Sequence, residues 1–262
     1  MELIFKDYEY KGSKINFKID SKSIIGITGD NLEEIIDIIK LKYKYKGSII
    51  INNEEINKSS INLYKRKIKV VNYQIEKLMY YNIYEIMDYV IRKERIYPKQ
   101  KDKKIKDSLK IVGLRQEILD QSINSISTSE LKLLKIALSL ISNPEIIIIE
   151  NPYEGLDLKN IKKIDLLYRK IKDQYDKTII FISKNTNILY KYSEKIIVFK
   201  DNKIITQGKT KDVFTKISLL KENNIEIPSL VYFTYKTKKM KKVKLDYHQD
   251  IRDLIKDIYK HV

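Results

Sequence analysis

Four consecutive isoleucines, Ile146 to Ile149, constrain the fold more than any other stretch of the sequence. A short run this apolar is typical of a central strand that is buried on both faces of a sheet. Similar β-branched runs alternate along the chain with patterns of helical periodicity, such as Leu32, Ile35, Ile36 and Ile39. This alternation predicts an α/β layered domain with a largely parallel sheet. The strands are expected at residues 3–5, 15–19, 23–28, 48–52, 69–71, 145–150, 178–183, 195–199 and 203–207.

The pattern changes at two places along the chain. Residues 82–142 contain no convincing strand and are expected to form a helical insertion. After Thr215 come a turn at Ile227-Pro228, a lysine block at 236–244 and a final amphipathic helix. The apolar face of that helix is expected to consist of Ile251, Leu254, Ile255 and Ile258. The organisation predicted is a domain at 1–215, with a helical subdomain at about 82–142, and an extension at 216–262.

Composition excludes several classes of protein. The chain has no cysteine, and its two histidines both lie near the C-terminus, so we expect neither a disulfide framework nor a histidine or cysteine metal site. It has no stretch of about 18 apolar residues and no apolar signal segment at its N-terminus. The net charge is +17, but lysine, isoleucine, asparagine and tyrosine dominate throughout, as expected of an AT-rich coding sequence. The charge alone therefore does not favour a nucleic-acid partner.

The stretch GITGDNLEE, from Gly26 to Glu34, has the layout of a phosphate-binding loop between a strand and a helix, but it carries acids. Asp30 with Glu33 fits the spacing of a helix-capping pair, and Leu32 is expected to face the core. We therefore expect the chain's own carboxylates to satisfy the start of this helix. Ser127 with Glu130 matches a second capping box, ahead of an apolar helix.

Several segments, in order, resemble the ATP-binding cassette of ABC transporters. They are GITGDNLE at the Walker A position, ISTSE (126–130) at the signature, IIIIENP (146–152) at Walker B, EGLD (154–157) at the D-loop and TIIFISKN (178–185) at the switch-histidine strand. The tail at 219–239 is similar to the C-terminal extension of energy-coupling-factor (ECF) transporter ATPases. The resemblance implies an ABC-type nucleotide-binding-domain fold, with a RecA-like mixed sheet core, an inserted helical subdomain and a small C-terminal dimerisation extension.

The resemblance also places a nucleotide site on positions that depart from the family pattern. Asn31 stands at the second Walker A glycine, Leu32 at the phosphate-binding lysine and Glu33 at the Mg²⁺-binding hydroxyl. Tyr10 stands at the adenine-stacking aromatic, and Asn72 at the Q-loop glutamine, although Gln74 leaves that register open. The nucleotide-binding positions implied are Tyr10, Gly26, Thr28, Gly29, Asp30, Asn31, Leu32, Glu33 and Asn72.

The catalytic and signature positions depart in the same way. The signature positions are Ser127, Thr128, Ser129 and Glu130, with Thr128 and Ser129 in place of glycines. Glu150 replaces the Walker B aspartate, and Asp157 retains the D-loop acid. Asn151 stands at the catalytic-base position, where an amide cannot accept a proton near neutral pH. Lys184 stands at the switch-histidine position. We therefore expect ATP hydrolysis to be absent or very weak, and we predict no metal site of the chain's own.

The leading hypothesis is a degenerate, non-hydrolysing homologue of an ECF-type ATP-binding subunit, with a structural or regulatory role in a membrane import complex. The resemblance implies a homo- or heterodimer with a second ABC ATPase subunit and a membrane-embedded coupling subunit. The location expected is cytoplasmic, peripheral to the inner face of the cell membrane. ATP and Mg²⁺ are expected only if the site is functional. A divergent ATPase and a basic nucleic-acid-binding module on a cassette fold remain as alternatives.

Overall fold

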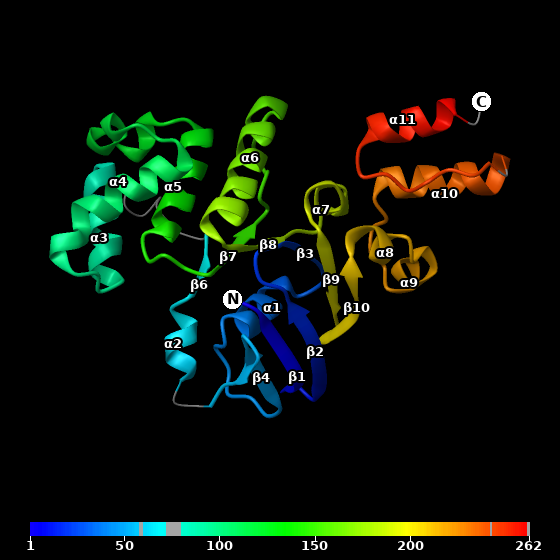
Figure 1. The fold of residues 1–262 in the computed structure, drawn as a ribbon, viewed down its shortest axis with the longest axis horizontal. Helices are drawn as coiled ribbons and strands as arrows, with labels where there is room; N and C mark the ends of the chain where they lie inside the picture. Colours follow the sequence, from blue (N-terminus) through cyan, green and yellow to red (C-terminus); the bar gives the residue numbers. More distant parts are fainter. Residues whose placement is uncertain (58–59, 72–79, 242, 261–262) are drawn as a thin grey trace. The chain divides into compact units, whose positions relative to one another are not determined.

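The structure is a computed structural model that describes residues 1–57, 60–71, 80–241 and 243–260. The chain divides into two compact units (Figure 1). The first unit consists of Met1–Ile56 with Ile180–Val262, and the second is Asn57–Ile179. Residues 216–262, which were expected to form an extension, belong to the first unit.

The first unit begins with an antiparallel sheet of order β2-β1-β4-β5. Its strands are β1 (Leu3–Tyr10), β2 (Ser13–Ile19), β4 (Ser48–Ile51) and β5 (Glu54–Glu55). Leu3, Phe5, Tyr8 and Tyr10 of β1 are buried, and the shift from odd to even positions coincides with a bulge between Phe5 and Tyr8. The two predicted runs at 3–5 and 15–19 are therefore confirmed as strands.

A second sheet of the first unit contains the strand order β10-β9-β3-β8. Its strands are β3 (Ile24–Gly29), β8 (Thr178–Ile182), β9 (Lys195–Lys200) and β10 (Lys203–Lys209). Every residue of β3 is buried, as expected of a strand covered on both faces. β3 pairs with β9 in parallel, whereas β9 pairs with β10 antiparallel, so the sheet is mixed, as the resemblance implied.

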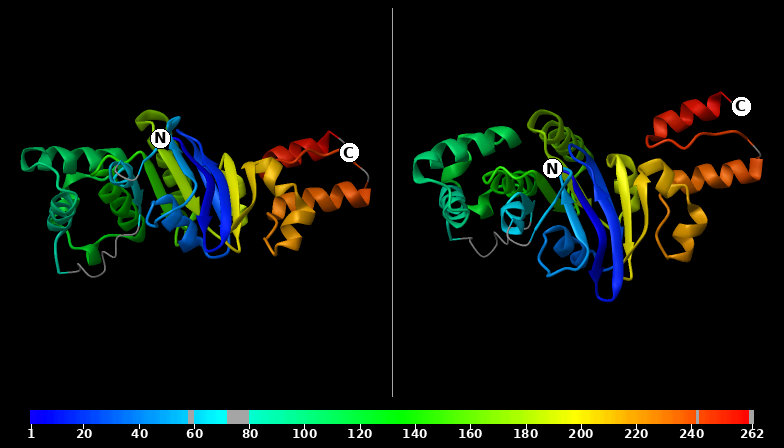
Figure 2. Two further views of the ribbon diagram at one scale, coloured as in Figure 1. Left: turned by 90° about the horizontal axis from the view of Figure 1, so that it is seen from below. Right: turned by 60° about the horizontal axis from the view of Figure 1, so that its bottom comes forward.

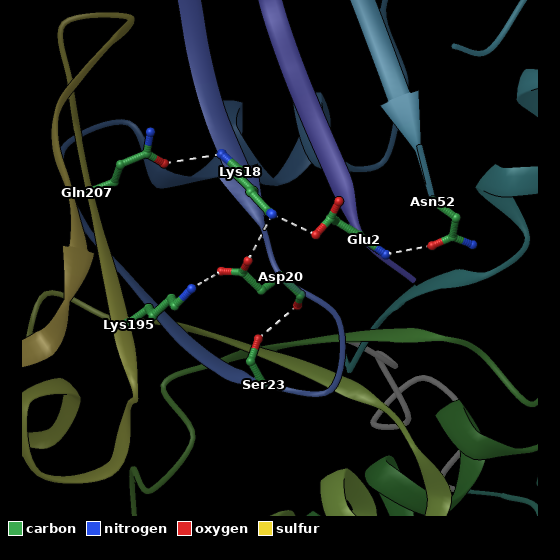
Figure 3. Close-up of polar contacts among 7 residues, drawn as sticks. All are labelled: Glu2, Lys18, Asp20, Ser23, Asn52, Lys195 and Gln207. Atoms are coloured by element: carbon green, nitrogen blue, oxygen red, sulfur yellow. Dashed lines mark hydrogen bonds and ion pairs between the residues drawn. The ribbon is translucent and has the colours of Figure 1, made fainter. Parts of the chain in front are cut away.

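A polar network joins β2 to the β9–β10 hairpin (Figure 3). Lys18 donates from its backbone to Gln207 Oε1 at 3.1 Å and from Nζ to Glu2 at 2.7 Å and Asp20 at 3.3 Å. Asp20 also pairs with Lys195 of β9. Burial raises the pKa of the Asp20 carboxyl, but hydrogen bonds from Lys195 and Lys18 outweigh it and hold that pKa below its usual value. These contacts fasten the two sheets of the first unit to each other.

The helices of the first unit follow its strands in sequence. They are α1 (Leu32–Ile39), α7 (Thr186–Tyr192), α8 (Thr210–Phe214), α9 (Ile217–Glu222), α10 (Ser229–Lys241) and α11 (Ile251–Tyr259). The final amphipathic helix is thus confirmed. Leu254 is buried, whereas Ile251 is 59% and Ile255 is 45% exposed, because the described chain leaves that side of α11 uncovered.

The second unit is mainly helical. Its helices are α2 (Ile61–Lys65), α3 (Ile83–Lys93), α4 (Lys101–Val112), α5 (Thr128–Leu140) and α6 (Leu158–Tyr175), with short 3₁₀ turns at Pro98–Gln100, Gln116–Asp120 and Ile123–Ser125. The strands β6 (Ile68–Val70) and β7 (Ile146–Glu150) pair in parallel. The helices α3 to α5, cyan to green in Figures 1 and 2, lie together in the region predicted to be a helical insertion. Within the described ranges, no helix is long and apolar enough to cross a membrane.

Candidate functional site

The loop between β3 and α1 is built around Gly29. Its φ is +128°, and a Cβ atom there would lie 1.8 Å from the carbonyl oxygen of Phe199. The next amide, that of Asp30, donates a hydrogen bond to the same oxygen at 3.0 Å. Only glycine tolerates this conformation and this close approach. Gly29 and the Asp30 amide therefore hold β3 against β9.

The predicted capping pair at the start of α1 is wrong. The N-cap is Asn31, which adopts a left-handed conformation (φ 52°) and makes no side-chain capping hydrogen bond. Asp30 precedes the cap and so cannot pair with Glu33 as a capping box requires. Leu32 is half-buried rather than enclosed in the core. Two carboxylates, Glu33 and Glu34, nevertheless lie in the first turn, where their negative charges interact favourably with the positive end of the helix dipole.

Two lysines from distant segments lie beside the acids of this loop. Lys184 Nζ is 4.0 Å from Asp30 Oδ1, and Lys11 Nζ donates to Glu34 Oε1. The hydrogen bond to Glu34 raises the pKa of Lys11. Both lysine side chains are more than half exposed, so each ion pair is weak. The acids at the Walker A position thus have cationic neighbours from within the chain.

The remaining Walker A residues are enclosed. Thr28 is buried, and a Cβ at Gly26 would lie 2.7 Å from Ser193 Oγ. Tyr10 is only 8% exposed, and the centroid of its ring lies 5.1 Å from that of the Tyr43 ring. Little of this ring is left for a stacked base, so the adenine-stacking role stays a prediction. Asn72 and Gln74 lie outside the described residues.

The signature segment of the second unit forms the predicted capping box. Ser127 is the N-cap of α5, and its Oγ accepts a hydrogen bond from the Glu130 amide at 3.3 Å. Glu130 Oε2 accepts in return from the Ser127 amide at 2.9 Å and hydroxyl at 2.7 Å. The hydrogen bond from the Ser127 side chain lowers the pKa of Glu130. Thr128 and Ser129 are the first two helical residues, so this segment is confirmed as a helix start.

The segment after β7 carries the Walker B and D-loop positions. Glu150 ends the strand and is exposed, as is Asn151, whose φ is +44°. The Asp157 carboxylate accepts a hydrogen bond from the Asn160 amide at 2.8 Å and so caps α6. That hydrogen bond lowers the pKa of Asp157. In the described residues, no three histidine, cysteine, aspartate or glutamate side chains come close enough to hold a metal ion.

Sequence reasoning missed Lys132, which fastens this segment from α5. Its Nζ donates to the carbonyl oxygens of Asn151 at 3.1 Å and Glu154 at 3.2 Å. Burial lowers the pKa of Lys132 to about 8, and Glu154 opposes that shift. From α6, Tyr168 donates to the carbonyl of Pro152 at 3.3 Å. No sequence signal distinguishes Lys132 among the 52 basic residues.

We expect Lys132→Met to destabilise the protein by about 1–2 kcal/mol, because two carbonyl groups lose their shared donor. Urea unfolding and hydrogen exchange at residues 151–156 measure this effect. Lys106→Met, at an exposed position of α4, is the matched control. It should change neither the free energy of unfolding nor the exchange at residues 151–156. Equal effects of the two substitutions would show that Lys132 has no special part in holding the segment.

The comparisons with known proteins identify relatives that match most of the chain. The family model described as ABC transporter matches residues 13–154. The chain is 26% identical to the energy-coupling factor transporter ATP-binding protein EcfA2 of Acetivibrio thermocellus, over 88% of this chain and 84% of that protein. It is 27% identical to EcfA2 of Mycoplasma mobile, over 96% of this chain and 89% of that protein.

Solved structures show the same fold. The cbiO1 protein of Clostridium perfringens, part of the ABC transporter complex cbiONQ, superposes with a TM-score of 0.71 and 21% identity over 89% of this chain and 98% of that chain. A dimeric bacterial ABC transporter cassette gives 0.62 and 22% identity over 79% of this chain and 98% of that chain. With the family model covering more than half of its residues, the chain belongs to the ABC transporter family.

Proposed function

We propose that this chain is a non-hydrolysing homologue of ECF-type ATP-binding subunits and that it has a structural or regulatory role in a membrane import complex. The observation that carries the proposal is the loop between β3 and α1. There the groups that a nucleotide requires are replaced, and the backbone is used for packing instead.

The residues of this loop do not fit the phosphates of Mg-ATP. A phosphate-binding loop needs free amides, a lysine and a hydroxyl at the start of its helix. Here the Asp30 amide is hydrogen-bonded to the carbonyl of Phe199. Leu32 occupies the position of the lysine, and Glu33 occupies the position of the hydroxyl. A carboxylate ~4 Å from a phosphate oxygen costs roughly 4 kcal/mol at an effective dielectric near 20, and the helix dipole contributes only about 1 kcal/mol.

Two further positions support the absence of hydrolysis. The amide of Asn151 cannot act as a general base near neutral pH. At the signature, Thr128 and Ser129 stand at the two positions where the family has glycines that approach a nucleotide, and Ser127 and Glu130 on either side hydrogen-bond to each other in the capping box. A dimer that needs this signature would therefore be impaired at the partner's site as well.

The names of the relatives suggest the kind of complex in which the chain acts. They are named as ATP-binding proteins of energy-coupling factor transporters and as part of an ABC transporter complex. By analogy, the chain pairs with a second ATPase subunit, as a homo- or heterodimer, on a membrane-embedded coupling subunit at the inner face of the cell membrane. Residues 1–215 then form the cassette, with its helical subdomain at about 82–142, and residues 216–262 form the dimerisation extension. The exposed Ile251 and Ile255 of α11 support the last assignment.

Thermal unfolding with millimolar Mg-ATP tests the proposal. A ligand at 100 times its dissociation constant adds about 2.7 kcal/mol of stability. For a chain of this size that corresponds to roughly 5–10 °C in Tm. We expect no shift and no phosphate release. A clear shift accompanied by phosphate release would instead favour the divergent ATPase.

A further inference from the structure

The helix α7 begins at Thr186, two residues after Lys184, and hydrogen bonds attach the segment before it to β3. Asn185 caps the helix by accepting a hydrogen bond from the Ile188 amide at 3.2 Å. The Asn185 amide donates to Ser183 Oγ at 3.1 Å, and the Ser183 amide donates to the carbonyl of Ile27 at 3.1 Å. The position of Lys184 beside Asp30 therefore depends on where α7 begins.

The other end of α7 is fixed to the same strand. Ser193, the residue after the helix, places its Oγ over Gly26, 2.7 Å from where a Cβ would lie. The Glu194 amide donates to the carbonyl of Ile24 at 2.8 Å, and its carboxylate accepts from the Ile24 amide at 3.2 Å. Contacts on both sides of the helix thus attach it to β3.

Residues of the C-terminal extension form hydrogen bonds with both the first turn and the C-terminal end of α7. Gln249 Nε2 donates to the carbonyl oxygens of Tyr190 at 2.6 Å and Ser193 at 3.3 Å, at the end of the helix, where carbonyls have no partner within it. The Ser193 carbonyl also accepts from Thr210 Oγ1 at 2.7 Å. In return, Asn187 Oδ1 accepts a hydrogen bond at 2.7 Å from the Ser229 amide at the start of α10. The extension and α7 therefore cap each other. A helix of seven residues is marginal alone, so its order depends on such contacts.

We infer that the C-terminal extension controls the candidate site through α7, with Gln249 and Asn187 as the positioning residues that join them. A partner that binds α10 or α11 and displaces Gln249 would loosen the end of α7, and with it the segment that carries Lys184. A partner that holds Gln249 in place would keep Lys184 beside Asp30. The effect requires that the partner binds the two arrangements with different affinity. This inference does not depend on whether the site binds nucleotide.

Hydrogen exchange on the nucleotide-free full chain tests the coupling. Gln249→Ala should speed exchange of the amides in α7 by about fivefold, the effect of losing the hydrogen bond to Tyr190, since the Ser193 carbonyl keeps Thr210 Oγ1 as a donor. Under the proposal, exchange at residues 27–33 rises as well, because the attachments of α7 to β3 are weakened. Asn187→Ala, which breaks the other contact, should give the same pattern.

Exchange in β1 and β2 is the internal reference and shows whether each variant is folded. Lys239→Ala, at an exposed position of α10, is the matched control and should leave both segments unchanged. The inference is overturned if α7 exchanges faster while residues 27–33 keep the wild-type rate in both variants. It is also overturned if neither segment responds.

Discussion

Leu32→Lys with Glu33→Thr is expected to raise the affinity for Mg-ATP by at least about 100-fold. The change removes one negative charge from the start of α1 and adds one positive charge, each worth up to roughly 4 kcal/mol to a phosphate ~4 Å away. Both positions are partly or fully exposed, so solvent will screen much of this energy. A third of the summed energy, about 2.7 kcal/mol, still corresponds to an increase in affinity of about 100-fold. Isothermal titration calorimetry measures the change.

The matched control for this variant is Leu166→Lys with Glu117→Thr. Both side chains are exposed in the second unit, and the substitutions make the same change in composition and net charge. We expect no gain of binding, since neither substitution changes a residue of the loop or of α1. If the control gained as much affinity as the loop variant, the attraction would be nonspecific.

Gly29→Ala is expected to destabilise the protein by about 4 kcal/mol and to lower Tm by roughly 10 °C. The added Cβ would lie 1.8 Å from the carbonyl oxygen of Phe199, so β3 and β9 must separate, and φ of +128° is strained for any side chain. Gly12→Ala is the matched control. It also has positive φ (+78°), but nothing lies within 4 Å of its Cβ position, so only about 1 kcal/mol is expected.

The comparison of Gly29 and Gly12 tests whether Gly29 is needed for packing between β3 and β9. A large effect at Gly29 without nucleotide would mean that this glycine is required for sheet packing. Its presence in the chain then carries no information about phosphate binding. Equal, small effects at Gly29 and Gly12 would contradict the close approach of Gly29 to Phe199.

The sequence predicted most of the fold because β-branched runs and helical periodicity report burial directly. Each of the nine expected runs overlaps a strand of the structure. The capping box at Ser127 was also predictable, because its two members lie three residues apart. The same logic failed at Asp30, since the left-handed conformation of Asn31 moves the cap by one residue, and spacing alone does not reveal that.

The contacts that sequence reasoning missed join residues far apart in the chain. Lys132 reaches the carbonyls of residues 19 and 22 positions later, and Lys11 reaches a carboxylate 23 positions later. The carbonyl acceptors have no sequence signature, because every residue has one. Such pairs can be found only once the fold has brought them together.

The most direct test of the account is equilibrium dialysis of the wild-type chain against radiolabelled ATP with Mg²⁺, with the Leu32→Lys/Glu33→Thr variant in parallel. We expect no bound nucleotide on the wild-type chain at millimolar ATP and saturable binding to the variant. Stoichiometric, Mg²⁺-dependent binding to the wild-type chain at micromolar ATP would contradict it.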